Sequence, residues 1–337
     1  MKKLVITFVF VVTAIAMPVS VTSASENRTD TNFAMDRETE ATLAAPSNWS
    51  APTRDIQSDS DQQALDQQQR SNGLIKVASA RVFGQAKSGA TKNPVPAPIY
   101  NLLNHNGPTL GDVHLYAIWW GPTANFPAGY RASIDAALSG MQCTTVTCAG
   151  MSSMMNQYLG TNSKTAITFS GDLVDTSAPV SSAPSTAAIV TEANKVATNA
   201  AIDPKGLYLV FTSNFPSRAN YCGWHGAGAV NNKWFTVAYM PNLSGVAGCS
   251  ATYLPSYSAT ANRLAAVDSV VNVLTHEVYE TITDPMLNNQ YAWYDALGNE
   301  IGDKCAWSTS SQVNLGSAGR FTVQKEWSNA ASACAAA

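Results

Sequence analysis

Three residues in the run VDSVVNVLTHEVYETITDP have the types and spacing to hold a metal ion and activate a water molecule: His276, Glu277 and Glu280. If the run is helical, His276 and Glu280 stand four residues apart, so their side chains share one face and can ligate the same ion. Glu277 lies about 100° around the helix from His276 and can serve as a general base. The spacing is that of the HExxH zinc motif, except that a glutamate replaces the second histidine. The predicted site is therefore rich in oxygen.

The flanking residues predict a helix over about 261–283. Apolar residues recur at steps of three and four, which gives a stripe suited to packing on a sheet: Val267, Val270, Val271, Leu274, Val278 and Ile282. Pro285 predicts the end of the helix, because proline disfavours the helical conformation in the residue before it. An alternative interpretation is an ordinary amphipathic helix whose polar face reads HExxE by chance.

A third ligand is available from two other segments. The segment AWYDALGNEIGDKCAW supplies the carboxylates of Asp295, Glu300 and Asp303 in a short, turn-rich stretch. YCGWHG places His225 in what we expect to be a loop. Each carboxylate ligand cancels charge on the metal, so His225 is a preferred ligand and Asp303 the next choice. Glu300 and Asp295 are expected to contact and orient the ligand side chains without binding the metal themselves.

Two tryptophans flank the predicted site in the sequence, Trp224 beside His225 and Trp293 near Asp295. Both are candidates to line a substrate cleft, although tryptophans more often belong to the core.

The rest of the domain alternates strand and helix patterns, which predicts an α/β (α+β) fold with a mixed sheet packed on the long motif helix. The expected strands are rich in β-branched and aromatic residues and cover 113–120, 165–174, 207–212 and 234–240. The expected shorter helices cover about 131–140, 150–158 and 186–200.

Several segments resemble one known family. YNLLNHNGPTL at 100–110, VHLYAIWWG at 113–121, YCGWHG, HEVYETITDP and the closing RFTVQKEWSNAASAC resemble the phosphate-induced, or EXORDIUM-like, secreted proteins. The match is closer to bacterial and fungal-type relatives that carry HExxE and are regarded as zinc-dependent peptidases. The resemblance implies a zincin-like domain with metal bound by His276 and Glu280 and with Glu277 as base. Plant members lack the HE pair and act as extracellular growth-related proteins, which implies the alternative of a non-catalytic protein.

Composition and the N-terminus indicate where the chain works. Only 13% of the 337 residues are charged and the net charge is -3, which argues against a nucleic-acid partner. Lys2 and Lys3 precede an apolar run and Thr22-Ser23-Ala24, so residues 1–24 are predicted to be a signal peptide and the protein to be secreted or periplasmic. We expect no stable membrane insertion after cleavage. Residues 25–95 are polar and are interpreted as a linker or a pro-segment, with the folded domain at 96–337.

Six cysteines fit an oxidising compartment. Fifteen pairings are possible, and the hypothesis of local order joins Cys143 to Cys148, Cys222 to Cys249, and Cys305 to Cys334. Zinc ligation by cysteine is not expected, because no CxxC pair is present.

Two functions remain open at the level of sequence. The first is a secreted, monomeric zinc metallopeptidase that hydrolyses peptides or proteins. The second is a secreted binding or signalling protein whose metal is structural or absent. A bracing calcium site in the Asp295–Asp303 loop is a third hypothesis, because its oxygen-rich composition suits a hard cation.

Overall fold

The computed structural model describes residues 75–78, 81–84, 100–197 and 202–336. The predicted signal peptide lies outside these residues, and so does most of the predicted linker or pro-segment at 25–95. None of the described helices has the length and apolar character that a membrane span requires.

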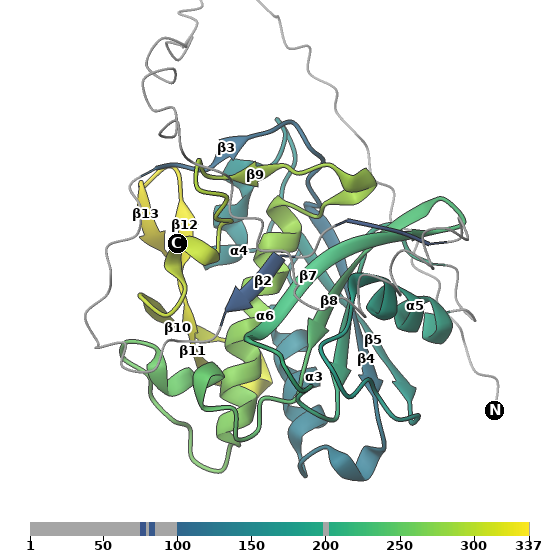
Figure 1. Ribbon diagram of the computed structural model, residues 1–337. Coiled ribbons are helices and arrows are strands. Elements are labelled where there is room, and N and C mark those ends of the chain that lie inside the picture. The colour runs from purple at the N-terminus through teal and green to yellow at the C-terminus, as the bar shows by residue number, and fades with distance from the viewer. Residues whose placement is uncertain (1–74, 79–80, 85–99, 198–201, 337) are drawn as a thin grey trace, which may run out of the picture. The chain divides into compact units, whose positions relative to one another are not determined.

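A mixed sheet of seven strands forms the centre of the described domain (Figure 1). Its order is β1-β7-β8-β6-β4-β5, and β2 also pairs with β7. The bounds are β1 (Ile75–Val77), β2 (Arg81–Gly84), β4 (Asp112–Trp120), β5 (Ala166–Asp175), β6 (Gly206–Thr212), β7 (Tyr221–Val230) and β8 (Lys233–Met240). Strands β5, β4, β6 and β8 run parallel, whereas β1 and β2 pair antiparallel with β7, which itself runs antiparallel to β8.

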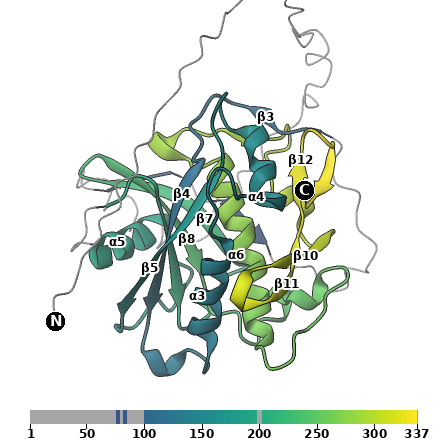
Figure 2. The same ribbon diagram turned by 180° about the vertical axis from the view of Figure 1, so that it is seen from behind.

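Four α-helices accompany the described sheet, which is the mixed α/β arrangement expected from the sequence. They are α3 (Tyr130–Met141), α4 (Gly150–Met154), α5 (Thr186–Ala197) and α6 (Ala265–Thr283). Helices α3 and α6 cover one face of the sheet and α5 covers the other (Figure 2). Alternate strand residues point to opposite faces, so Trp119 joins the core beneath α3 and α6 while Ile118 joins the core beneath α5.

Short elements complete the described structure. The small sheets pair β3 (Leu103–Asn104) with β9 (Trp293–Tyr294), β10 (Ser310–Asn314) with β11 (Arg320–Gln324), and β12 (Glu326–Ser328) with β13 (Ala333–Ala335). The 3-10 helices are η2 (Thr123–Asn125), η3 (Met155–Tyr158), η4 (Ala247–Cys249), η5 (Ala251–Tyr253), η6 (Leu287–Asn289), η7 (Asp303–Cys305) and η8 (Gly316–Ala318).

Helix α6 is buried around its whole circumference from Val267 to Thr283. The sheet packs on one side of the helix, and the C-terminal strands β10 and β11 lie along another (Figure 2). The helix therefore has no solvated polar face over this range, and the interpretation of HExxE as the polar face of an amphipathic helix is wrong. Its charged residues lie in the protein interior, where each must be paired, protonated or bound to a cation.

Two sequence-based expectations are corrected by the sheet. His225 was expected in a loop, but it lies in the middle of β7. The pattern of β7 is obscured because helices cover both faces of the sheet, and such strands lack polar alternation. Strands β1 and β2 fall inside the predicted linker at 25–95, so the folded part extends to the N-terminal side of residue 96.

Three disulfide bonds join Cys143 to Cys148, Cys222 to Cys249, and Cys305 to Cys334. These are the pairs that the local order of the cysteines predicts. They fit an oxidising compartment.

Candidate metal centre

Five side chains predicted from the sequence to form the site come together between β7 and α6. Helix α6 contributes His276, Glu277 and Glu280, strand β7 contributes His225, and η7 contributes Asp303. The four side chains from α6 and β7 are completely or almost completely buried, and Asp303 is half-buried. These residues fall into two groups that could each hold a metal ion, and Glu280 belongs to both.

The first group contains His276, Glu280 and Asp303. The Nε2 atom of His276 lies 3.1 Å from Oε1 of Glu280, but the two atoms do not have the geometry of a hydrogen bond. On the other side of the ring, Gln324 Nε2 lies 2.9 Å from Nδ1 of His276. The backbone N–H of Asp303 donates to Oε1 of Glu280 at 3.2 Å. This group is the ligand set predicted with Asp303 as the third ligand.

The second group contains His225, Glu277 and Glu280. The Nδ1 atom of His225 lies 3.2 Å from Oε2 of Glu277 and 3.4 Å from Oε2 of Glu280. Its Nε2 atom lies 3.2 Å from the backbone carbonyl oxygen of Asp284. A carbonyl oxygen can only accept, so Nε2 carries a proton, and Nδ1 is the nitrogen that faces the carboxylates. A histidine ligand held by a backbone carbonyl is common at metal sites.

The donor atoms fit a metal ion such as zinc. Nitrogen and oxygen ligands bound to a tetrahedral zinc ion lie about 3.4 Å apart, and the separations of 3.1 Å, 3.2 Å and 3.4 Å found here are of that size. Oε1 of Glu280 faces His276 and Oε2 faces His225, so this carboxylate connects the two groups. Oε1 of Glu277 is buried and has no hydrogen-bond partner among the described residues.

The local charges also favour a cation. Burial lowers the pKa of His276, but the carboxylates of Glu280, Glu277 and Asp303 raise it by more, to about 10. Burial raises the pKa of Glu277, and it raises the pKa of Glu326 well above its usual range. Burial alone would raise the pKa of Glu280, but His276 and His225 lower it below its usual range. Buried acids thus exceed buried bases around α6, and a bound cation would relieve their repulsion.

Three residues near the site were not identified from the sequence. Gln324 Nε2 lies 2.9 Å from Nδ1 of His276 and donates to the carbonyl oxygen of Gly302 at 3.0 Å. Glu326 is fully buried, and Oε1 accepts from Gln324 Nε2 at 3.4 Å. A Cβ atom on Gly302 would lie 2.4 Å from Nδ1 of His276. The available signal was the spacing of Gln324 and Glu326, which lie on either side of Lys325 in the sequence. Residues two apart lie on one side of an extended chain.

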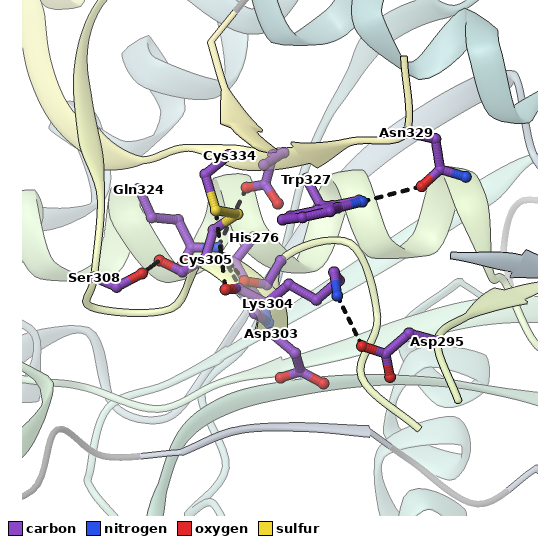
Figure 3. The surroundings of a disulfide bond; sticks show 12 residues. His276, Asp295, Asp303, Lys304, Cys305, Ser308, Gln324, Trp327, Asn329 and Cys334 are labelled. Atoms are coloured by element: carbon purple, nitrogen blue, oxygen red, sulfur yellow. Dashed lines mark hydrogen bonds and ion pairs between the residues drawn. A yellow bond between two sulfur atoms is a disulfide. The ribbon is translucent and has the colours of Figure 1, made fainter. Parts of the chain in front are cut away.

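Asp295 and Lys304 form a buried ion pair at 2.8 Å beside the Cys305–Cys334 disulfide (Figure 3). Asp295 also accepts from the backbone N–H groups of Leu297 and Asn299. The ammonium of Lys304 is thus a cation that Asp295 already faces, which argues against the predicted calcium site in this loop. Asp295 shapes the loop that carries Asp303.

The remaining predicted residues take different places. Glu300 is buried with Oε1 3.7 Å from Nε2 of His225, so it lies behind the second group. Trp224 packs beneath α5, on the face of the sheet opposite His225, and does not line a cleft at the site. The indole N–H of Trp293 donates to the carbonyl oxygen of Tyr158 at 2.7 Å, and its ring packs on the edge of Tyr158.

A phenylalanine from β2 covers His276. The Phe83 ring lies 4.1 Å from the His276 ring between centroids, at an interplanar angle of 31°, and it stacks on Trp307 at 5.0 Å. Phe83 is 1% exposed. The first group is therefore closed on this side by an aromatic side chain.

Comparison with known proteins yields no relative: no family model, curated protein or solved structure matches the chain.

Proposed function

We propose that the protein is a secreted zinc-dependent metallopeptidase with a zincin-like catalytic domain, related to the HExxE-containing EXORDIUM-like proteins. The observation that carries this proposal is the convergence of His276, Glu280 and Asp303 beside Glu277 in the interior. The same residues can form structural ion pairs without a metal. Histidine and carboxylate side chains are, however, ligand types that zinc prefers, and here two histidines face three carboxylates. The three disulfides support the secreted location.

The residues have distinct roles under this proposal. His276, Glu280 and Asp303 would hold the ion, and His225 would contact the Glu280 carboxylate, whose Oε2 lies 3.4 Å from its Nδ1. A zinc ion in such a site would act as a Lewis acid and lower the pKa of a bound water, by less than in a histidine-rich site because its carboxylate ligands offset the charge of the metal. Glu277 accepts the proton of the attacking water and delivers it to the leaving amine. His225 positions the Glu277 carboxylate through the contact of 3.2 Å.

Replacing Glu277 by glutamine tests the base directly. Glu277→Gln keeps the size of the side chain but removes its basicity, so we expect hydrolysis of fluorescein-labelled casein to fall at least about a hundredfold. Zinc content should stay unchanged. The assay uses the intact chain and a nicked chain, whose backbone has been cut between Gly84 and Tyr100. The cut breaks the covalent link between β2 and the rest of the domain, and it is placed there because Phe83 of β2 covers His276. The matched control is Glu192→Gln, which makes the same change in α5 on the opposite face of the sheet and should keep activity. Hydrolysis that survives Glu277→Gln would refute the role of this residue.

One observation favours a second candidate, a non-catalytic binding or signalling protein with a structural metal. His276, Glu277, Glu280 and His225 are at most 1% exposed, and structural zinc sites are closed in this way. This candidate predicts that zinc binds and stabilises the fold while neither the intact nor the nicked chain hydrolyses casein. The metallopeptidase proposal requires that the covering of the site can be moved.

A further inference from the structure

The covering of the site comes from a segment that lies far from it in the sequence. Strand β2 pairs antiparallel with β7, with Arg81 opposite His225 and Phe83 opposite Gly223. Strand β1 pairs with the far end of β7, from Gly228 to Val230. Together they occupy the edge of β7 that faces away from β8 (Figure 1). An extended peptide that adds to a sheet edge binds in the same manner.

The position of Phe83 brings this segment beside the candidate base. Gly223, its partner on β7, has so little space that a Cβ atom there would lie 3.3 Å from Oε1 of Glu277 and 2.6 Å from Cγ1 of Val273. The backbone of β2 is therefore one strand spacing from the β7 residue whose Cβ position faces Glu277. A peptide seated in place of β2 would have its backbone opposite His225 and Gly223 of β7.

The Phe83 side chain lies in an aromatic sandwich. Its ring is between His276 and Trp307, and the interplanar angle to Trp307 is 15°. Trp307 itself has a backbone φ of 59°, a left-handed conformation that is costly for a bulky residue and is often found at functional sites. Trp307 also packs edge-to-face with Tyr253, with the ring centroids 6.3 Å apart. His276 and Trp307 thus hold one flat apolar side chain between them by ring contacts.

We propose that β2 occupies the binding position of an extended peptide substrate, that the protein prefers an aromatic side chain at the position of Phe83, and that β2 keeps the site closed until it is displaced. This inference rests on the proposed peptidase function. Main-chain pairing with β7 would supply affinity without regard to sequence, and the His276–Trp307 sandwich would supply the specificity. Because β2 belongs to the same chain, its effective concentration exceeds that of most free substrates.

The test severs the segment without removing it from the folded protein. A recognition site for a specific protease is inserted between Gly84 and Tyr100, the full chain is folded, and the insert is then cut. The synthetic peptide IKVASARVFG, which is residues 75–84, is labelled with a fluorophore, and its binding to the cut protein is followed by anisotropy. We expect saturable binding. The matched peptide IKVASARVAG, which carries the Phe83→Ala change, should bind at least about tenfold more weakly.

A point variant of the uncut chain provides a second readout. Phe83→Ala should speed both casein hydrolysis and the removal of zinc by a colorimetric chelator, because the ring over His276 is gone. The control Phe169→Ala truncates a half-buried aromatic in β5, at the opposite edge of the sheet, and should change neither rate.

The outcomes separate this inference from the proposed function. Phe83-dependent peptide binding without any hydrolysis would uphold the peptide site and refute the peptidase. Full hydrolysis by the uncut wild-type chain, unaffected by Phe83→Ala, would uphold the peptidase and overturn this inference. The inference is also overturned if the cut segment leaves only when the domain unfolds, because β2 would then be a permanent part of the sheet.

Discussion

At the scale of single residues, the site depends on close packing around His276. Gly302 lies against the ring, Gln324 Nε2 lies 2.9 Å from Nδ1, and Phe83 packs on the ring at an interplanar angle of 31°. Gly302 has an ordinary helical conformation, with φ of -80° and ψ of -42°. The glycine is therefore required by space and not by backbone conformation, since a Cβ atom would lie 2.4 Å from Nδ1 of His276 and 3.0 Å from Oε1 of Glu280.

Gly302→Ala should weaken zinc binding by displacing His276 and Glu280 from each other. We expect a loss of about 10- to 100-fold in zinc affinity, the size seen when groups that orient metal ligands are changed. Affinity is measured by competition with a chelator. Gly160→Ala is the control, because the nearest heavy atom to its added Cβ is Ser163 Oγ at 4.0 Å. Equal zinc affinity in wild type and Gly302→Ala would show that the His276 group does not hold the ion.

The sequence predicted in part which side chains lie close together at the candidate site. The spacing of His276, Glu277 and Glu280 on one helix follows from the turn of an α-helix, so their proximity could be foreseen. The contact of His225 with Glu277 could not, because it depends on the register of β7 against α6. The same is true of Gln324 and Glu326, which reach the site through tertiary packing of β11 and β12.

At the scale of elements, α6 and β7 place the site by two different periodicities. The helical turn directs His276 and Glu280 to one side, and the alternation of β7 directs His225 to the same side while Trp224 faces α5. The helix ends at Thr283, and Asp284, just before Pro285, offers its carbonyl oxygen to His225. The end of the helix, which Pro285 predicts, thus also orients the His225 ring.

Helix α5 on the other face carries a buried acid whose titration should be visible in stability. Burial raises the pKa of Glu192 from 4.5 to about 7, with a further contribution from Asp175 and an opposing one from Lys195. The folded state then binds a proton more tightly than the unfolded state, so this contribution to the free energy of unfolding falls as pH rises from about 4.5 to about 7. Glu192→Gln removes the titration. Urea denaturation across this range should show the free energy of unfolding of Glu192→Gln rising relative to wild type and levelling above pH 7. A difference that stays constant with pH would contradict this.

At the scale of the whole described domain, the fold class was predictable but its N-terminal limit was not. Buried strands such as β4 and β6 and the long helix α6 leave clear apolar patterns. Strands β1 and β2 have three and four residues and gain their structure by pairing with β7, so no periodic signal marks them. A segment interpreted as a linker or pro-segment therefore contributes to the covering of the site.

The disulfides should contribute unequally to the stability of the domain. Cys305 and Cys334 are 29 residues apart, whereas Cys143 and Cys148 are 5 apart. The chain-entropy relation gives about 4 kcal/mol for the longer loop and about 2 kcal/mol for the shorter one. The Cys305→Ala/Cys334→Ala protein should therefore lose more free energy of unfolding in guanidinium than Cys143→Ala/Cys148→Ala. It should also bind zinc more weakly, because η7 carries both Cys305 and Asp303. Equal losses and equal zinc affinity would contradict this.

The most direct test of the proposed metal centre is the zinc content of the purified, secreted protein, measured by elemental analysis beside His276→Ala. The proposal predicts at least about one zinc ion per wild-type chain and a large loss in His276→Ala, with circular dichroism confirming that both proteins are folded. A folded wild-type protein with its three disulfides formed and no zinc would contradict it.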